Sequence, residues 1–317
     1  MDNYSKKERT VKGKHIGLRG GVLLLICVII ELVLRFVFGF CDAVLYQPSE
    51  AYEYIAQPNQ YRYRFFSHIN CNSYSQRSEE PDFGKTIVLG LGDSVIFGGT
   101  MIDQNAIATT LFSTETGMQM LNISSGSWGP DNCAAYLREK GTFGARIMIL
   151  VCSSHDAYDL MSHVPVVGIF PNYPNKQYKV AIWEAVDRYM MPKVRRLVNK
   201  AQLVDPDTQV VKQSNDGGVV NKSAMFNSGF DQLAEIAREN NIPFLIYLHP
   251  EIGEIVNSGY KDGGRLIIEW AKDNNVPLFQ ELMMGVKVDM YRDVIHFNEK
   301  GQRLMADNLI KIIKRLN

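Results

Sequence analysis

The stretch KTIVLGLGDS, residues 85–94, is the part of this sequence that decides the fold. Residues 85–91 form a mostly apolar run without polar alternation, which predicts a strand buried on both faces of a parallel sheet. Gly92, Asp93 and Ser94 follow directly. Taken alone, these three residues also fit an ordinary turn and helix cap. A serine at the carboxyl end of such a strand nevertheless lies where open α/β folds build their active sites.

The alternation of short apolar runs and helical segments continues to the C-terminus. Further apolar runs predict strands at residues 118–124, 145–152, 242–250 and 276–282. Helical patterns predict helices at residues 103–116, 130–141, 230–241, 263–275 and 301–317. Strands that alternate with helices form a parallel sheet covered on both faces. We therefore expect one domain over residues 85–317, with an insertion at 157–222 that includes a long helix around 180–201. Its fold class would be a three-layer α/β/α sandwich with a parallel sheet of about five strands.

A second candidate for chemistry lies near the C-terminus, where Asp293 and His296 precede the last predicted helix. A serine is a poor nucleophile until a base takes its proton, and an imidazole base needs an acid group that fixes its tautomer. An aspartate and a histidine in one loop can supply both groups. Two polar segments, residues 122–126 and 153–156, close the second and third predicted strands. All these segments are therefore expected at one edge of the sheet.

In order and spacing, the segments resemble the motif blocks of the SGNH/GDSL hydrolase family, over most of residues 85–316. Gly92-Asp93-Ser94 and Asp293-x-x-His296 match the first and last blocks of that family. The resemblance implies that Ser94 is the nucleophile, His296 the base and Asp293 its orienting partner. It also implies that the amides of Ser94 and Gly126 contribute to an oxyanion hole, and that the reaction needs no cofactor.

The two middle blocks depart from the family pattern. Gly126 lies four residues after Asn122, where family members often have five, so that Ser127 is an alternative to Gly126. In the third block, Ser153 replaces a glycine and His155 replaces an asparagine. A neutral imidazole can donate one N–H, so we expect His155 to act as an oxyanion donor, with a loop-stabilising role as the alternative.

Two polar residues after the fourth predicted strand have no place in these blocks. His249 and Glu251 either contact the substrate or stabilise a turn at the end of the strand. The sequence alone leaves both interpretations open.

The N-terminal region has the charge pattern of a membrane anchor. Residues 1–19 hold six basic and two acidic side chains, a net charge of +4, and the apolar stretch at 20–40 follows. This pattern predicts a cytoplasmic leader and a transmembrane signal anchor, in preference to a cleaved signal peptide, because no convincing cleavage site follows. Glu31 and Arg35 interrupt the apolar stretch but can pair on one helical face. Residues 42–84 would then be an extended connector that leads to a catalytic domain outside the cytoplasm.

Together these features predict a serine esterase or acyltransferase at the cytoplasmic membrane. The membrane-anchored pattern resembles family members that modify cell-surface polysaccharides, which implies acyl esters, acetyl esters above all, of a carbohydrate as substrates. A membrane-bound acyltransferase is an expected partner. The alternative is a non-catalytic scaffold or binding protein of polysaccharide export, which the altered third block favours.

Composition excludes some other classes of protein. Basic and acidic residues balance at 34 each, so that nucleic acid is not an expected partner. No Cys or His spacing indicates a metal site. A disulfide between Cys71 and Cys133 remains open at this point.

Overall fold

The computed structural model describes residues 2–194 and 225–316, with side chains from residue 19 onward. The chain divides into two compact units. The first comprises Met1–Ala43, Arg64–Phe66 and Gln177–Asp205, and the second comprises Val44–Tyr63, Ser67–Lys176 and Pro206–Asn317. Residues 195–222 of the predicted insertion lie outside the described residues, and so does the end of its predicted long helix.

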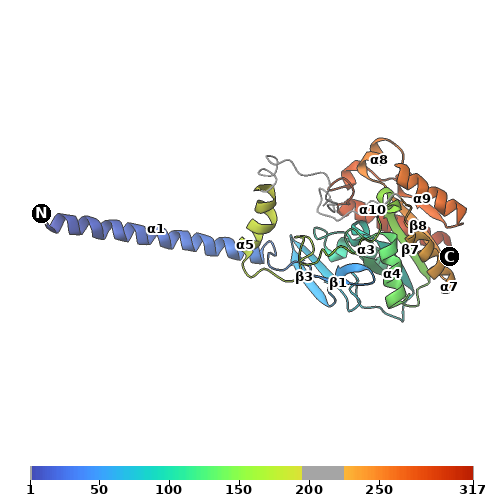
Figure 1. Cartoon of the computed structure of the whole chain (residues 1–317), viewed down its shortest axis with the longest axis horizontal. Coiled ribbons are helices and arrows are strands. Elements are labelled where there is room, and N and C mark those ends of the chain that lie inside the picture. Colours follow the sequence, from blue (N-terminus) through green and yellow to red (C-terminus); the bar gives the residue numbers. More distant parts are fainter. Residues whose placement is uncertain (1, 195–224, 317) are drawn as a thin grey trace. The chain divides into compact units, whose positions relative to one another are not determined.

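The second unit contains a five-stranded parallel sheet, as the sequence predicted (Figure 1). Its strands are β5 (Ile87–Gly92), β6 (Gln119–Ser124), β7 (Ile147–Ser153), β8 (Phe244–His249) and β9 (Leu278–Gln280). Their order across the sheet is β6-β5-β7-β8-β9, and all neighbouring strands run parallel. The first strand of the sheet therefore lies inside it, with the second strand on one side and the third on the other.

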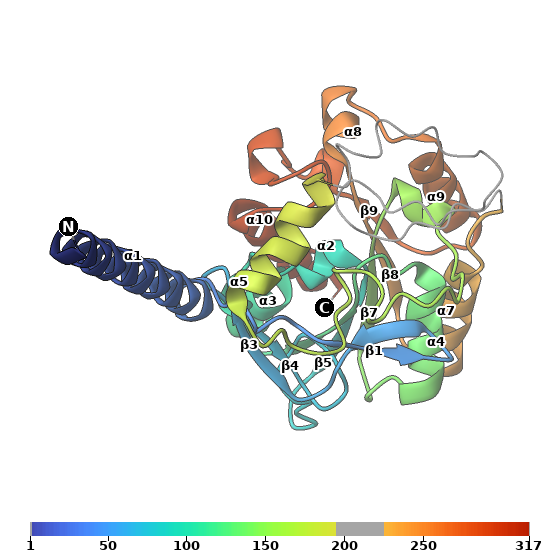
Figure 2. The ribbon, with the colours of Figure 1, turned by 60° about the vertical axis from the view of Figure 1, so that its left-hand side comes forward.

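Helices cover both faces of this sheet (Figure 2). Successive strand residues point to opposite faces, so that Leu89 and Leu91 pack on one side and Val88 on the other. The first face carries α4 (Pro130–Lys140), α7 (Gly229–Glu239) and α9 (Asp262–Asp273). The second face carries α2 (Ser94–Phe97), α3 (Ala108–Thr116) and α10 (Glu299–Leu316). The predicted three-layer α/β/α arrangement is thus confirmed.

Short elements complete the connections of the second unit. They are α8 (Ile252–Val256) and the 3₁₀ turns η1 (Gln104–Ala106), η2 (Ser154–Ala157), η4 (Glu281–Met283) and η5 (Val288–Met290). Three of them lie at the carboxyl edge of the sheet, because η2 and η4 directly follow strands and α8 begins three residues after the last residue of β8.

The segment 42–84, for which the sequence predicts an extended connector, contains four short strands. These are β1 (Tyr46–Ser49), β2 (Glu53–Ala56), β3 (Gln60–Arg64) and β4 (Ser67–Cys71), which pair as β1-β2 and β3-β4. Tyr46, Tyr54 and Ile69 from this segment join the core beside α4 and α7. Aromatic side chains that would be costly to expose are therefore buried against the sheet domain.

The first unit consists mainly of α1 (Asp2–Phe36), α5 (Ala181–Ala185) and η3 (Val186–Met190). The Glu31 carboxylate accepts hydrogen bonds from the backbone amides of Ala181, at 2.8 Å, and Ile182, at 2.9 Å. These amides have no partner inside α5 because they lie in its first turn. Arg35 pairs with Glu31 at 3.0 Å, in agreement with their predicted pairing on one helical face.

The prediction of a transmembrane helix at 20–40 is not supported by the structure. Over the described residues, no helix combines the length and the apolar character that crossing a bilayer requires. The helical part of the stretch ends at Phe36 and contains both Glu31 and Arg35.

All five cysteines lie among the described residues, and all five are free thiols. Cys71 and Cys133, the pair for which the sequence left a disulfide open, are both buried. Burial raises the pKa of the Cys71 thiol to about 11, so that it is unreactive at neutral pH.

Candidate active site

The polar segments predicted to carry chemistry meet at the carboxyl edge of the sheet. The connections that follow β5 and β7 leave in opposite directions across the sheet. The chain passes from β5 to β6 on one side, and from β7 to β8 on the other. Such a switch point leaves a crevice at the carboxyl ends of the two strands. Ser94 begins α2 directly after β5, and His155 lies in η2 directly after β7.

The turn into α2 requires a glycine. Gly92 has a φ of +152°, and a Cβ atom there would collide with the backbone carbonyl oxygen of Val151 on β7. The next residue, Asp93, caps α2 by accepting a hydrogen bond from the Val95 amide at 2.8 Å. Gly-Asp-Ser is therefore a turn and helix cap as well as the segment that presents Ser94.

The structure brings Ser94, His296 and Asp293 together. The Oγ of Ser94 lies 2.8 Å from Nε2 of His296. Nδ1 of the same ring lies 2.9 Å from both carboxylate oxygens of Asp293. An Asp293 carboxylate can only accept, so the proton on the imidazole belongs on Nδ1, and Nε2 is left to accept the serine proton.

Local hydrogen bonds keep Asp293 ionised. The amides of Ile295 and His296 both donate to its Oδ1, at 3.1 and 2.8 Å. Burial by itself raises the pKa of Asp293, but the hydrogen bonds from the His296 side chain and these amides outweigh burial and hold this pKa well below its usual value. Asp293 therefore remains a carboxylate, and a hydrogen-bond acceptor for His296, across the ordinary pH range.

The short helix that carries Ser94 is held by buried side chains from distant parts of the chain. Asn122 Nδ2 donates to the Ile96 carbonyl at 2.8 Å, and Gln302 Nε2 donates to the Val95 carbonyl at 3.2 Å. The buried Arg77 guanidinium donates to the carbonyls of Phe97 and Ile102, each at 2.6 Å, and to that of Gly99. Carbonyls at the end of a helix have no intrahelical partner, so these side chains satisfy them.

Two of these supporting residues, Arg77 and Gln302, were missed in the sequence analysis. Arg77 lies in a polar stretch before β5, and Gln302 lies in a helix whose amphipathic pattern is set by its apolar residues. No local pattern distinguishes a buried arginine or glutamine from an exposed one. Only the approach of their elements to α2 shows their role.

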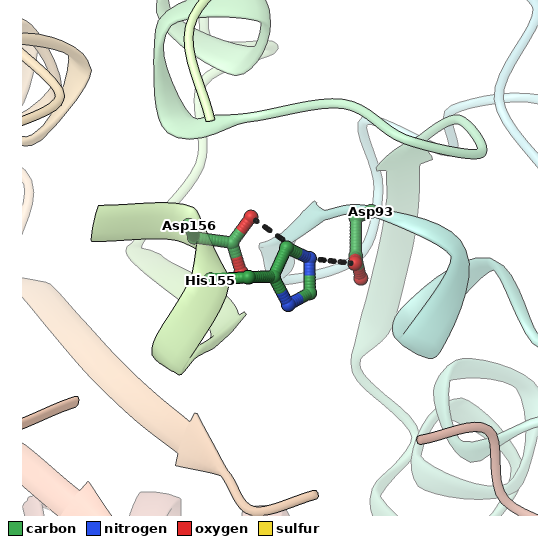
Figure 3. Close-up of side chains that lie close together, drawn as sticks. All are labelled: Asp93, His155 and Asp156. Atoms are coloured by element: carbon green, nitrogen blue, oxygen red, sulfur yellow. Dashed lines mark ion pairs between the residues drawn. The ribbon is translucent and has the colours of Figure 1, made fainter. Parts of the chain in front are cut away.

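His155 lies between carboxyl groups rather than in a neutral environment (Figure 3). Its Nε2 is 3.5 Å from Asp93 Oδ2 and 3.8 Å from Asp156 Oδ1, and its Nδ1 is 3.9 Å from Glu251 Oε1. Burial alone lowers the pKa of His155, but the nearby carboxyl groups of Asp156 and Asp93 outweigh burial and raise it to about 10. An imidazolium is thus favoured here, whereas the predicted oxyanion role was for a neutral ring.

The same contacts bear on the predicted role of His155 as an oxyanion donor. Both ring nitrogens face carboxyl groups, so a hydrogen bond to an oxyanion would compete with the contact to Asp93. The oxyanion role of His155 stays a prediction, and the ion pair with Asp93 is the interaction that the geometry provides.

The Asp93, His155 and Asp156 side chains also form the candidate metal cluster among the described residues. Their potential ligand atoms all lie within 4.8 Å of one another. Asp93 already accepts from the Val95 amide, and Asp156 accepts from the Ser153 amide at 2.6 Å. A protonated His155 cannot ligate a metal through a nitrogen that holds a proton, and it supplies the positive charge that the carboxyl groups require. The donor set therefore fits an ion-paired imidazolium better than a metal.

Gly126, the other predicted oxyanion residue, follows β6 at the same edge of the sheet. Its carbonyl oxygen accepts hydrogen bonds from the hydroxyls of Tyr54, at 2.8 Å, and Tyr173, at 3.2 Å. The next residue, Ser127, has a φ of +57°. Two phenols therefore fix the direction of the Gly126 carbonyl. The oxyanion roles of the Gly126 and Ser94 amides stay predictions.

A pocket of 460 Å³ opens beside His155. It is lined by Ser154, His155, Tyr158, Glu251, Lys261, Asp262 and Gly263. Glu251 forms an ion pair with Lys261 at its wall. Of the two residues that the sequence left open after β8, Glu251 therefore faces a pocket, whereas His249 is fully buried.

Comparison with known proteins gives only distant structural likeness. No family model matches the chain, and no curated protein matches it significantly. Similar solved structures include an acetyl xylan esterase, with 13% identity, 72% of this chain and 99% of that chain covered, and a TM-score of 0.41. Esterase EstA from Pseudoalteromonas sp. is 14% identical, the match covers 73% of this chain and 98% of that chain, and the TM-score is 0.40. The aryl esterase of M. smegmatis has 13% identity, 73% and 100% coverage and a TM-score of 0.40.

Likeness at this level establishes neither a shared activity nor membership of a family. The fold of this chain is given by its own strand order and helix layers. The chemistry that the site can perform is given by the contacts of Ser94, His296 and Asp293.

Replacing Arg77 by methionine is expected to destabilise the protein strongly. The variant keeps the apolar stem but leaves the buried carbonyls of Phe97, Gly99 and Ile102 without their donor. We expect a loss of about 3–5 kcal/mol in the free energy of unfolding, measured by urea denaturation. Arg138→Met, which removes exposed ion pairs with Glu235 and Glu239, is the control and should cost less than about 1 kcal/mol. Equal losses would contradict the supporting role of Arg77.

Replacing His155 by glutamine should destabilise the protein in a pH-dependent way. The folded-state pKa of His155 is raised to about 10, so its stabilising effect is fully present below its unfolded pKa of about 6.5 and is lost as pH rises through the folded value. We expect His155→Gln to cost about 1–3 kcal/mol at pH 6. The difference from the parent should shrink towards pH 10 in denaturant titrations. A difference that stays constant over this range would show that the ion pairs of His155 do not stabilise the fold.

Proposed function

We propose that this protein is a serine esterase or acyltransferase of the SGNH/GDSL type, with Ser94, His296 and Asp293 as its catalytic residues. Its proposed substrates are acyl esters, above all acetyl esters, of a cell-surface carbohydrate. The observation that carries the proposal is the unbroken hydrogen-bond chain from Ser94 Oγ through the His296 ring to Asp293, with distances of 2.8 and 2.9 Å. This chain of contacts provides a nucleophile, a base and an orienting acid at a strand end.

The reaction would proceed through an acyl-enzyme. Ser94 Oγ attacks the ester carbonyl while its proton passes to Nε2 of His296. The resulting imidazolium is stabilised by the Asp293 carboxylate, and it gives the proton to the departing alcohol oxygen as the carbon–oxygen bond of the ester breaks. Water or a sugar hydroxyl then attacks the acyl group and loses its proton to Nε2 of His296. The imidazolium passes this proton to Ser94 Oγ as the bond between Oγ and the acyl carbon breaks, which restores Ser94.

Backbone amides are the proposed stabilisers of the negative oxygen in these steps. The Ser94 amide lies in the first turn of α2, where N–H groups have no intrahelical acceptor. The Gly126 carbonyl, held by Tyr54 and Tyr173, belongs to the same planar peptide as the Ser127 amide. These contacts therefore limit the directions of the Ser127 N–H, which is the alternative donor to the Gly126 amide. Donors that are oriented before the reaction stabilise an oxyanion without reorganisation.

Hydrolysis and acyl transfer use the same three residues and differ in the acceptor. We place the acceptor in the pocket beside His155, whose lining includes Tyr158, Glu251 and Asp262. A non-catalytic scaffold remains the alternative function. It is favoured by His155, whose ion pair with Asp93 departs from the family pattern.

We also propose that the N-terminal region holds the chain at the cytoplasmic membrane, with the chain from about residue 42 onward on the outer side. The +4 leader supports this orientation. Apolar side chains of α1 are exposed, Leu24 at 67% and Phe36 at 70%, and an exposed apolar surface calls for a partner. Glu31 and Arg35 are already engaged with residues 179–182 of the chain. A membrane-bound acyltransferase is the proposed partner at this location.

Ser94→Ala is expected to abolish covalent labelling by a fluorophosphonate probe and to lower kcat on an activated acetyl ester by about 10⁴-fold or more. The circular dichroism spectrum should not change. Ser228→Ala, at an exposed serine before α7, is the matched control and should be labelled like the parent. Equal labelling of Ser94→Ala would exclude the covalent mechanism, and an unlabelled parent would favour the scaffold.

The proposed location is tested by fusing a reporter enzyme after residue 45 of the full N-terminal region. Alkaline phosphatase, which needs an oxidising compartment, is expected to be active in this fusion, and a cytoplasmic reporter at the same position should be inactive. The physical reason is the retention of the basic leader on the inner side of the membrane. Activity of the cytoplasmic reporter would refute both the orientation and the location.

A further inference from the structure

The His249 side chain is fully buried at the end of β8 and lies outside the predicted catalytic residues. Its Nδ1 is 2.5 Å from Oε2 of Glu281, which is also fully buried. Its Nε2 is 2.8 Å from the backbone carbonyl oxygen of Ile295. A buried imidazole thus connects a buried carboxyl group to the loop that contains Asp293 and His296.

The partners of His249 decide where its protons lie. The Ile295 carbonyl can only accept, so Nε2 must hold a proton and donate it. The hydroxyl of Tyr247 lies 2.7 Å from Oε1 of Glu281 and itself accepts from Asn308 Nδ2 at 3.1 Å, so it donates to Glu281. Wherever the proton between Nδ1 and Oε2 resides, the hydrogen bond from Nε2 to Ile295 remains.

This hydrogen bond acts on the peptide unit that carries His296. The Ile295 carbonyl and the His296 amide belong to the same planar peptide. His249 holds the carbonyl end, while the Asp293 carboxylate accepts from the amide end at 2.8 Å. Because the group is rigid, fixing both ends fixes its plane and with it the position from which the His296 side chain leaves the backbone.

The His249 ring also contacts both ends of the loop. It stacks on Tyr291 with 5.5 Å between ring centroids, and its edge meets Phe297 at 4.5 Å. Tyr291 and Phe297 form an isolated antiparallel bridge, and the Arg292 amide donates to the His296 carbonyl at 2.9 Å. The Tyr291 hydroxyl donates to the Pro250 carbonyl at 2.5 Å. His249 therefore lies against the base of the loop and holds its middle.

We propose that His249, held in place by Glu281, is a positioning residue that sets the orientation of His296 relative to Ser94. The inference rests on the proposed function for its effect on catalysis, but the geometry of the loop is tested separately. His249 does not touch the reacting atoms and acts through the Ile295–His296 peptide. Misplacing a catalytic group by about 1 Å can cost about 10²-fold in rate.

The experiment compares three variants of the full chain in detergent. His249→Phe keeps an aromatic ring but removes both nitrogens. Glu281→Gln can donate to Nδ1 of a neutral His249 while its amide oxygen still accepts from Tyr247, so the hydrogen bond to Ile295 is kept. Tyr260→Phe is the matched control, because the Tyr260 hydroxyl is a buried donor to the Leu248 carbonyl, at 2.8 Å, one residue before His249.

Turnover of an activated acetyl ester is the first measurement. His249→Phe is expected to lower kcat by about 10²-fold with little change in KM. Glu281→Gln should retain most of the parent kcat, and Tyr260→Phe should retain it even where its thermal stability falls. A His249→Phe protein that folds and is as active as Tyr260→Phe would overturn the proposal. Equal loss in all three variants would also overturn it, since it would show a general loss of stability.

Hydrogen exchange of residues 291–298 is the second measurement and does not depend on activity. It should become faster in His249→Phe and stay at the parent rate in Glu281→Gln and Tyr260→Phe. Unchanged exchange in His249→Phe would contradict the positioning role. If the parent itself shows no turnover, the proposed function fails, whereas the exchange result still decides whether His249 holds the loop.

A third measurement reads the proton positions in the unmodified protein and uses the Glu281→Gln variant only to assign the His249 signal. Nitrogen–proton correlation spectra of the six histidines report which ring nitrogen holds a proton. The signal that shifts in Glu281→Gln identifies His249. Its Nε2 should be protonated throughout pH 6–9. A bare Nε2 at any pH in this range would remove the hydrogen bond to Ile295 and with it the proposal.

Discussion

The geometry of the candidate site depends on hydrogen bonds to the backbone carbonyls at the end of α2. This helix has four residues, so it cannot satisfy its own last carbonyls. Three buried side chains do so instead, Gln302 from α10, Asn122 from β6 and Arg77 from the segment before β5. Each comes from a different part of the chain, so Ser94 is oriented only when the sheet, the last helix and the segment before β5 have all assembled.

The opposite half of the site is held in a similar way. The loop that carries Asp293 and His296 has little regular structure, yet its central peptide is fixed by His249 on one side and by Asp293 on the other. The two halves meet at the 2.8 Å contact between Ser94 and His296. Groups on loops are held in precise positions when buried neighbours restrict them, and here the restriction comes from hydrogen bonds to backbone atoms.

The charged groups around His155 differ from those around His296. His296 faces one ionised carboxylate and a hydroxyl, which suits a base that gains and loses a proton. His155 faces the carboxyl groups of Asp93, Asp156 and Glu251, and these contacts favour an imidazolium. Burial raises the pKa of Asp156 to about 8 and Glu251 is paired with Lys261, so the ionised partner of His155 at neutral pH is Asp93. Two histidines at the same sheet edge therefore differ in what they can do. The proposed chemistry assigns proton transfer to His296, whereas His155 links the strand ends of β5 and β7.

The sequence by itself determined the layered α/β fold and the meeting of Ser94, Asp293 and His296. Buried parallel strands are continuous apolar runs, and residues at their carboxyl ends must converge on one edge. Only the tertiary structure decided the roles of Arg77, Gln302 and His249, and which residues of the four short strands between Tyr46 and Cys71 join the core. The structure also does not support the transmembrane helix that the sequence predicts at residues 20–40. The physical reason is that apolar periodicity is local, whereas the burial and partners of a polar side chain depend on which distant segments approach it.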